Sequence, residues 1–106
     1  MGTPYYLSPE VCEDKPYNQK SDVWALGIIL YEMATLNYPF QAKNEAELML
    51  KIVRGKYSTS RIQSLYTNGK DITTLIQSML IKDMNERPSV KQLIMHPLVQ
   101  KRALKL

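Results

Sequence analysis

The sequence has little cysteine, little histidine and no long apolar run. Cys12 is the only cysteine, so no internal disulfide can form, and a single free thiol fits a reducing compartment best. His96 is the only histidine and has no second ligand at a suitable spacing, so no metal site is expected. No stretch approaches the roughly 18 apolar residues that a membrane-spanning helix needs. We therefore expect a cytoplasmic protein without a membrane contact, with the nucleus or the cytoskeleton as alternatives.

The sequence also lacks a dense run of positive charge. Its 14 Lys and Arg residues exceed its 10 Asp and Glu residues and give a net charge of +4, but they are spread from Lys15 to Lys105. Nucleic-acid binding is therefore not expected. With 106 residues, 44% of them hydrophobic and 23% charged, the chain fits one folded domain with one core.

The pattern of apolar residues predicts an all-α fold. Residues 1–20 contain three prolines and no helical or strand periodicity, so we expect a turn-rich loop with one helical turn at 9–12. About four helices are expected after this loop, over residues 23–36, 44–54, 72–80 and 90–96. No strand-like alternation is present.

Polar residues suit the ends of these helices. The expected caps are Ser21 or Asp22 for the first helix, Gly55 at the end of the second, Asp71 for the third, and the capping box of Ser89 and Gln92 for the fourth. In the fourth helix, Val90, Leu93 and Ile94 are expected to face inward. Residues 56–70 are expected to form a polar linker, and residues 103–106 a final turn.

The first predicted helix is apolar on every side. Its apolar residues point all around the helix axis, and a helix of this kind must be buried on all sides. Three short, one-sided helices can cover about half of its circumference. Part of its surface should therefore face a missing partner, or mediate self-association.

Three motifs occur in the order and at the spacing typical of protein kinases: Ser8-Pro9-Glu10, then Asp22, Trp24 and Gly27 in the pattern Asp-x-Trp-x-x-Gly, then Arg87-Pro88-Ser89. The chain resembles the serine/threonine protein kinases, and the strings Gly2-Thr3-Pro4-Tyr5-Tyr6-Leu7 and Lys15 to Asp22 are similar to those of the NIMA-related kinases. The resemblance implies part of the large, C-terminal lobe. Residues 1–20 would form the end of the activation segment and the substrate-facing loop, and residues 21–106 the helical part.

The resemblance also implies roles for individual residues. Thr3 would help to orient the acceptor hydroxyl, and Tyr5, Tyr6 and Leu7 would line the pocket for the residue after the phosphoacceptor. The implied structural residues are Glu10 and Arg87, which would form a buried pair, together with Asp22, Trp24 and Gly27. Two solvated charges are the alternative for the pair. Asp22 would hold the catalytic loop in an intact kinase, and helix capping is its remaining role here.

The intact family transfers the ATP γ-phosphate with magnesium, using a glycine-rich loop, a strand lysine, an HRD-type loop and a DFG motif. None of these elements occurs in the sequence, so no catalytic, cofactor-binding or metal-binding residue is expected. We expect a kinase fragment that is inactive alone, with protein substrates or the missing N-terminal kinase region as partners. A non-catalytic interaction or scaffold module, and a non-functional gene product, are the alternatives.

Overall fold

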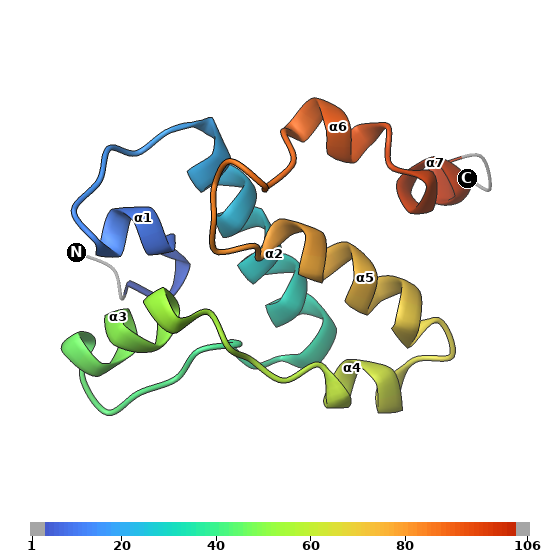
Figure 1. Ribbon diagram of the computed structural model, residues 1–106. Helices are drawn as coiled ribbons and strands as arrows, with labels where there is room; N and C mark the ends of the chain where they lie inside the picture. The colour runs from blue at the N-terminus through green and yellow to red at the C-terminus, as the bar shows by residue number, and fades with distance from the viewer. Residues whose placement is uncertain (1–3, 104–106) are drawn as a thin grey trace.

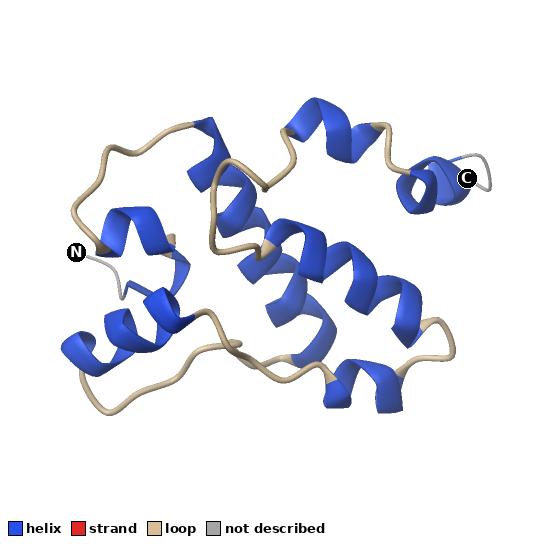
Figure 2. Cartoon of the chain, in the orientation of Figure 1, coloured by secondary structure: helices blue, strands red, loops and turns tan. Residues whose placement is uncertain are grey.

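One long helix, α2 (Gln19–Thr35), crosses the middle of the fold, and the other elements surround parts of it (Figure 1). The computed structural model describes residues 4–103, and these residues contain helices and loops but no strand (Figure 2). The remaining elements are η1 (Pro4–Tyr6), α1 (Pro9–Cys12), α3 (Glu45–Arg54), α4 (Ser60–Leu65), α5 (Gly69–Met79), α6 (Val90–Ile94) and α7 (Pro97–Ala103). The expected all-α class is confirmed, and none of the described helices is long and apolar enough to cross a membrane.

The helix α2 begins four residues earlier than predicted, and neither Ser21 nor Asp22 is its N-cap. Asn18 takes that position: its side-chain oxygen accepts from the Lys20 backbone N–H at 2.7 Å. The Ser21 hydroxyl accepts from the Asn18 backbone N–H at 3.2 Å and completes a capping box. The prediction was wrong because it placed the cap directly before the first apolar residue, whereas the reciprocal bonds favour Asn18.

The second and third predicted helices are present as α3 and α5. Asn44 caps α3 by accepting from the Glu47 N–H at 2.8 Å, and Gly55 ends it in the left-handed conformation at φ 71°. Asp71 does not cap α5, because that helix begins at Gly69. Its apolar residues recur at helical spacing and form one stripe toward the core, with Ile76 completely buried: Ile72, Leu75, Ile76, Met79 and Leu80.

The predicted polar linker contains a further helix, α4. Ile62 is the reason, since its side chain is completely buried in the core between α2 and α5, whereas Leu65 of the same helix is exposed. Gly69 closes the corner between α4 and α5: a Cβ there would lie 2.6 Å from the Ile62 carbonyl oxygen and 2.7 Å from the Gln63 Cα. Long-range burial of Ile62 therefore decides the structure of a segment whose composition is mostly polar.

The C-terminal end differs from the prediction in two respects. The capping box of Ser89 and Gln92 opens α6 as expected, but only Leu93 is buried, and Val90 and Ile94 are exposed. The helix α6 ends at Ile94, two residues earlier than predicted, and Pro97 begins α7, because its fixed φ and missing N–H suit the first helical position. The predicted final turn after residue 103 lies outside the described residues.

The core lies on one side of α2. Trp24, Ile28 and Tyr31 are buried there against α3, α4 and α5. On the other side, Leu26 and Ile29 each keep 42% of their surface exposed, and neighbouring Met33 keeps 71%. The described residues thus leave an apolar stripe of α2 uncovered, as its all-round apolar sequence predicted.

Candidate functional site

The segment that the resemblance assigns to substrate contact lies against α2, α3 and the loop after α2. Tyr5 stacks face to face on Tyr38, with ring centroids 4.0 Å apart and an interplanar angle of 0°. Tyr6 meets the same ring edge to face at 5.9 Å, and Leu7 is half-buried. Tyr5 and Tyr6 are therefore brought together against the Tyr38 ring. Thr3 lies outside the described residues.

Tyr6 is tied to α2 by a polar contact as well. Its hydroxyl donates to the Glu32 carboxylate at 2.6 Å, and this hydrogen bond raises the pKa of the Tyr6 phenol. Tyr6 is 37% exposed, so one edge of the ring faces the solvent. The segment therefore exposes part of an aromatic ring to the solvent, while the contacts with Tyr38 and Glu32 fix its position.

A buried ion pair joins α1 to the segment before α6. Arg87 donates from Nη1 to Glu10 Oε2 at 2.9 Å and from Nη2 to Glu10 Oε1 at 3.1 Å, in a bidentate contact. Arg87 is 1% exposed and Glu10 is 4% exposed. Burial raises the pKa of Glu10, but hydrogen bonds from Arg87 and Ser21 outweigh it, and the resulting pKa is about 2. The structure thus contains the pair that the resemblance implied, and the alternative of two solvated charges is wrong.

The guanidinium of Arg87 has no unused donor. Besides the two bonds to Glu10, its Nη1 donates to the Lys20 carbonyl at 2.7 Å, its Nε to the Ile81 carbonyl at 2.9 Å and its Nη2 to the Lys82 carbonyl at 3.2 Å. These five bonds use all five N–H groups of the side chain. Arg87 therefore connects α1, the start of α2 and the turn after α5.

Two residues of the Asp-x-Trp-x-x-Gly motif pack at the centre of this arrangement. Trp24 is completely buried, with its ring 5.2 Å from the Arg87 guanidinium carbon and stacked on Phe40 at 5.9 Å. Gly27 lets α5 approach α2 closely, since a Cβ at this position would lie 2.8 Å from both Met79 Cβ and Leu80 Cδ2. Trp24 belongs to the core cluster against which Tyr5 packs, and Gly27 fixes the contact of α2 with α5.

Asp22, the remaining residue of the motif, has no such partner. Its side chain is exposed in the first turn of α2, and it makes no hydrogen bond or ion pair within residues 4–103. The capping role predicted for it is wrong, because Asn18 has that role. Its charge still lies near the positive end of the helix dipole.

Three contributing residues were missed by the sequence analysis: Glu32, Tyr38 and Ser21. Glu32 is the only charged residue between Val23 and Leu36, and a lone charge in an apolar helix was a usable signal. Ser21 donates to Glu10 Oε2 at 2.7 Å. No pattern in the sequence links Ser21 to Glu10, or Tyr38 to Tyr5.

The site has features of a binding surface. Cys12, the only cysteine of the sequence, lies in α1. Burial raises the pKa of its thiol to about 11, and the neighbouring carboxylates of Glu10 and Glu13 add to this effect. A thiol of this kind stays protonated at neutral pH and is a poor nucleophile. Within the part of the chain that the structure describes, no group of three His, Cys, Asp or Glu side chains could hold a metal ion.

Comparisons with known proteins agree with this architecture. The model of the protein kinase domain matches residues 1–99. The serine/threonine-protein kinase Nek1 of Mus musculus is 43% identical over 96% of this chain, and the probable serine/threonine-protein kinase nek3 of Dictyostelium discoideum is 47% identical over 93%. Among solved structures, the twitchin kinase region from C. elegans superposes with a TM-score of 0.79 at 27% identity, covering 92% of this chain and 17% of that one.

The matched part is small in each of these relatives. The chain spans 8% of the length of Nek1 and 8% of nek3, and 27% of the serine/threonine-protein kinase nekl-2 of Caenorhabditis elegans. The family match nevertheless covers most of this chain, and the relatives are named consistently. The chain belongs to the protein kinase family, as a segment similar to part of the serine/threonine kinases of the NIMA-related (Nek) type.

Proposed function

We propose that this chain supplies the substrate-facing part of a serine/threonine protein kinase, whose complete form transfers the γ-phosphate of ATP to protein hydroxyls. The observation that carries the proposal is the seating of Tyr5 and Tyr6 on Tyr38 and Glu32, directly before the buried Glu10–Arg87 pair. A substrate segment needs a surface of fixed position, because phosphoryl transfer depends on the placement of the acceptor hydroxyl.

The groups that bind ATP and transfer phosphate come, in this proposal, from outside these 106 residues. The sequence contains no glycine-rich loop, HRD-type loop or DFG motif. Without them the charge of the γ-phosphate has no neutralising partner. The chain alone is therefore expected to be inactive, and protein substrates and the rest of a kinase domain are its expected partners.

A second candidate is a non-catalytic interaction module. The exposed apolar stripe of Leu26, Ile29 and Met33 on α2 favours it, since a surface of this kind is costly to leave in water. The two candidates differ in what covers the stripe: the remainder of a kinase domain in the first, and another protein or a second copy in the second. Sedimentation of the purified chain separates them, because a defined dimer supports the module and a monomer favours the kinase part.

A chimera tests the first candidate. The matching segment of murine Nek1 is replaced by this chain, and phosphate transfer from Mg-ATP to a serine- and threonine-containing protein is measured beside the chain alone. We expect the chimera to be active and the chain alone to show no transfer. Arg87→Ala should abolish the activity of the chimera, whereas Lys70→Ala, an exposed lysine on α5, should leave it unchanged.

Two results would contradict the proposal. A soluble, folded chimera without activity would show that this substrate-facing surface does not function in a kinase. Transfer by the purified chain alone, kept by Lys70→Ala and lost in Arg87→Ala so that contaminating kinases are excluded, would show that the catalytic groups are not external.

A further inference from the structure

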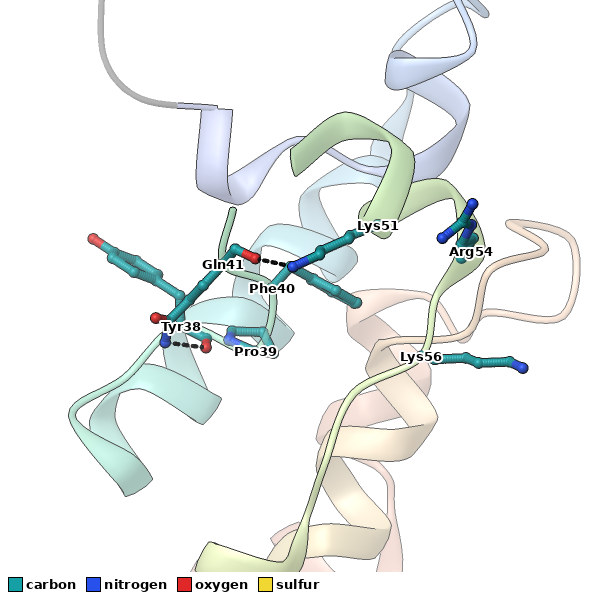
Figure 3. A pocket seen from close by; sticks show the side chains of 7 residues that line it. All are labelled: Tyr38, Pro39, Phe40, Gln41, Lys51, Arg54 and Lys56. Carbon is teal, nitrogen blue, oxygen red and sulfur yellow. Dashed lines mark hydrogen bonds between the residues drawn. The ribbon is translucent and has the colours of Figure 1, made fainter. Parts of the chain in front are cut away.

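A pocket of about 420 Å³ opens between the loop after α2 and the C-terminal end of α3 (Figure 3). Its lining is apolar and aromatic on one side and basic on the other: Tyr38, Pro39, Phe40, Gln41, Lys51, Arg54 and Lys56. Within residues 4–103, no acidic residue lines it. The pocket is therefore positively charged, whereas the nearby contact between Tyr6 and Glu32 contains a carboxylate.

The apolar side of the pocket is preformed. Phe40 is only 2% exposed, and its ring is held by Trp24 at 5.9 Å and by Tyr57 at 5.8 Å. Gln41 donates from its side chain to the Tyr38 carbonyl at 3.1 Å, which closes the loop on itself. The fixed Phe40 ring holds the neighbouring residues Tyr38 and Pro39 in place. These residues need little further ordering when a ligand binds, and this lowers the entropic cost of association.

The basic side carries uncompensated charge. Lys51 donates to the Gln41 carbonyl at 2.6 Å and lies 3.5 Å from Glu47, so its charge is partly neutralised. Arg54 and Lys56 are exposed and have no hydrogen bond or ion-pair partner within residues 4–103. Gly55, at φ 71°, turns the chain between them and allows both side chains to border the same pocket.

The charged ends do not converge on one point. In Figure 3 the amine of Lys51 reaches toward Gln41, whereas the side chains of Arg54 and Lys56 extend in other directions, at the opposite end of the pocket from Tyr38. A single phosphate group would need donors directed at one position. Donors spread along a rim instead match several negative charges carried in a row.

The pocket adjoins the surface described above. Tyr38 borders it and also stacks on Tyr5. A polypeptide bound along Tyr5 and Tyr6 would therefore meet the pocket at Tyr38.

From these observations we infer that the pocket docks an acidic segment of a partner protein, with Asp and Glu carboxylates at Arg54 and Lys56 and an apolar side chain against Tyr38 and Pro39. The basic part of the lining selects acidic side chains, and the apolar part selects an apolar side chain. The spread of the cations selects a carboxylate-rich segment over one phosphorylated residue. The inference requires only that the chain folds, so it can fail or hold independently of the kinase activity.

Fluorescence anisotropy of a labelled peptide with the full chain tests this site. The probe is Gly-Leu-Glu-Asp-Glu-Leu-Glu-Gly, and its matched control has Gln and Asn in place of Glu and Asp. The test variant is Arg54→Gln with Lys56→Gln. The control variant is Arg61→Gln with Lys70→Gln, which removes the same charges from the exposed surfaces of α4 and α5.

We expect the test variant to raise the Kd of the acidic peptide about threefold or more, and the control variant to leave it within twofold. The amide peptide should bind the wild type more weakly than the acidic one. An equal loss in both variants would reduce the binding to net charge and overturn the docking site. Tighter binding of single-stranded RNA or of a singly phosphorylated peptide through Arg54 and Lys56 would also overturn it, because the occupant would then be a different one. Circular dichroism confirms that each variant is folded.

Discussion

Replacing Arg87 by alanine should destabilise the fold severely. The substitution removes both bonds to Glu10 and leaves that carboxylate, which is 4% exposed, without a cation. It also removes the donors to three backbone carbonyls. Breaking a buried pair by removing one partner costs about 3–5 kcal/mol.

This cost can be read as a thermal shift. For a domain of this size, about 1 kcal/mol corresponds to roughly 4 °C or slightly more in the unfolding midpoint. We therefore expect the midpoint of Arg87→Ala, followed by circular dichroism at pH 7, to fall by about 12–20 °C. Arg54→Ala is the matched control, because Arg54 is exposed, and it should change the free energy of unfolding by less than about 0.5 kcal/mol.

A double-mutant cycle separates the ion pair from the loss of packing. Glu10→Gln and Arg87→Met are made singly and together, and urea unfolding gives the free energy of each variant. If the pair is coupled as its geometry indicates, the double variant loses clearly less than the sum of the single losses. Additive losses, or a midpoint of Arg87→Ala within about 2 °C of the wild type, would refute the reasoning.

Three further predictions concern other parts of the structure. Gly27→Ala should cost about 1–3 kcal/mol, because its Cβ would overlap Met79 at the contact of α2 with α5; an unchanged urea midpoint would contradict that contact. The pKa of Glu10 is lowered from 4.5 to about 2, so the contribution of this carboxylate to stability is present above pH 4.5 and is lost as the pH falls toward 2. Glu10→Gln should therefore make the thermal midpoint depend less on pH in this range. A midpoint that falls as steeply in the variant as in the wild type would contradict this prediction. Leu26→Ser with Met33→Ser should reduce binding of a hydrophobic dye while lowering the thermal midpoint by only a few degrees, and undiminished dye binding would place the apolar surface elsewhere.

Local patterns predicted the helices that carry a periodic signal. The stripe of α5 and the ends of α3 at Asn44 and Gly55 follow from neighbouring residues alone, and the structure agrees with them. The start of α2 was misjudged because several polar residues compete for the cap. The helix α4 was missed, since its position depends on the burial of Ile62 by elements far away in the sequence.

The candidate site was predictable to a different extent. The pairing of Glu10 with Arg87 was expected only through the family resemblance, because no local rule joins residues 77 positions apart. The contacts of Tyr5 with Tyr38 and of Tyr6 with Glu32 were not expected at all. Side-chain contacts of this kind arise when separate helices pack, so no periodicity records them.

By itself, the sequence determined the all-α class, the motifs of the protein kinase family and the presence of one helix too apolar to be covered fully. These properties depend on composition, periodicity and short-range order, which are fixed before the chain folds. The tertiary structure alone decided which side of α2 stays exposed, how Arg87 uses all of its donors, and how Arg54 and Lys56 border an aromatic pocket. Such features depend on distances between segments remote in the chain, and packing of the core sets those distances.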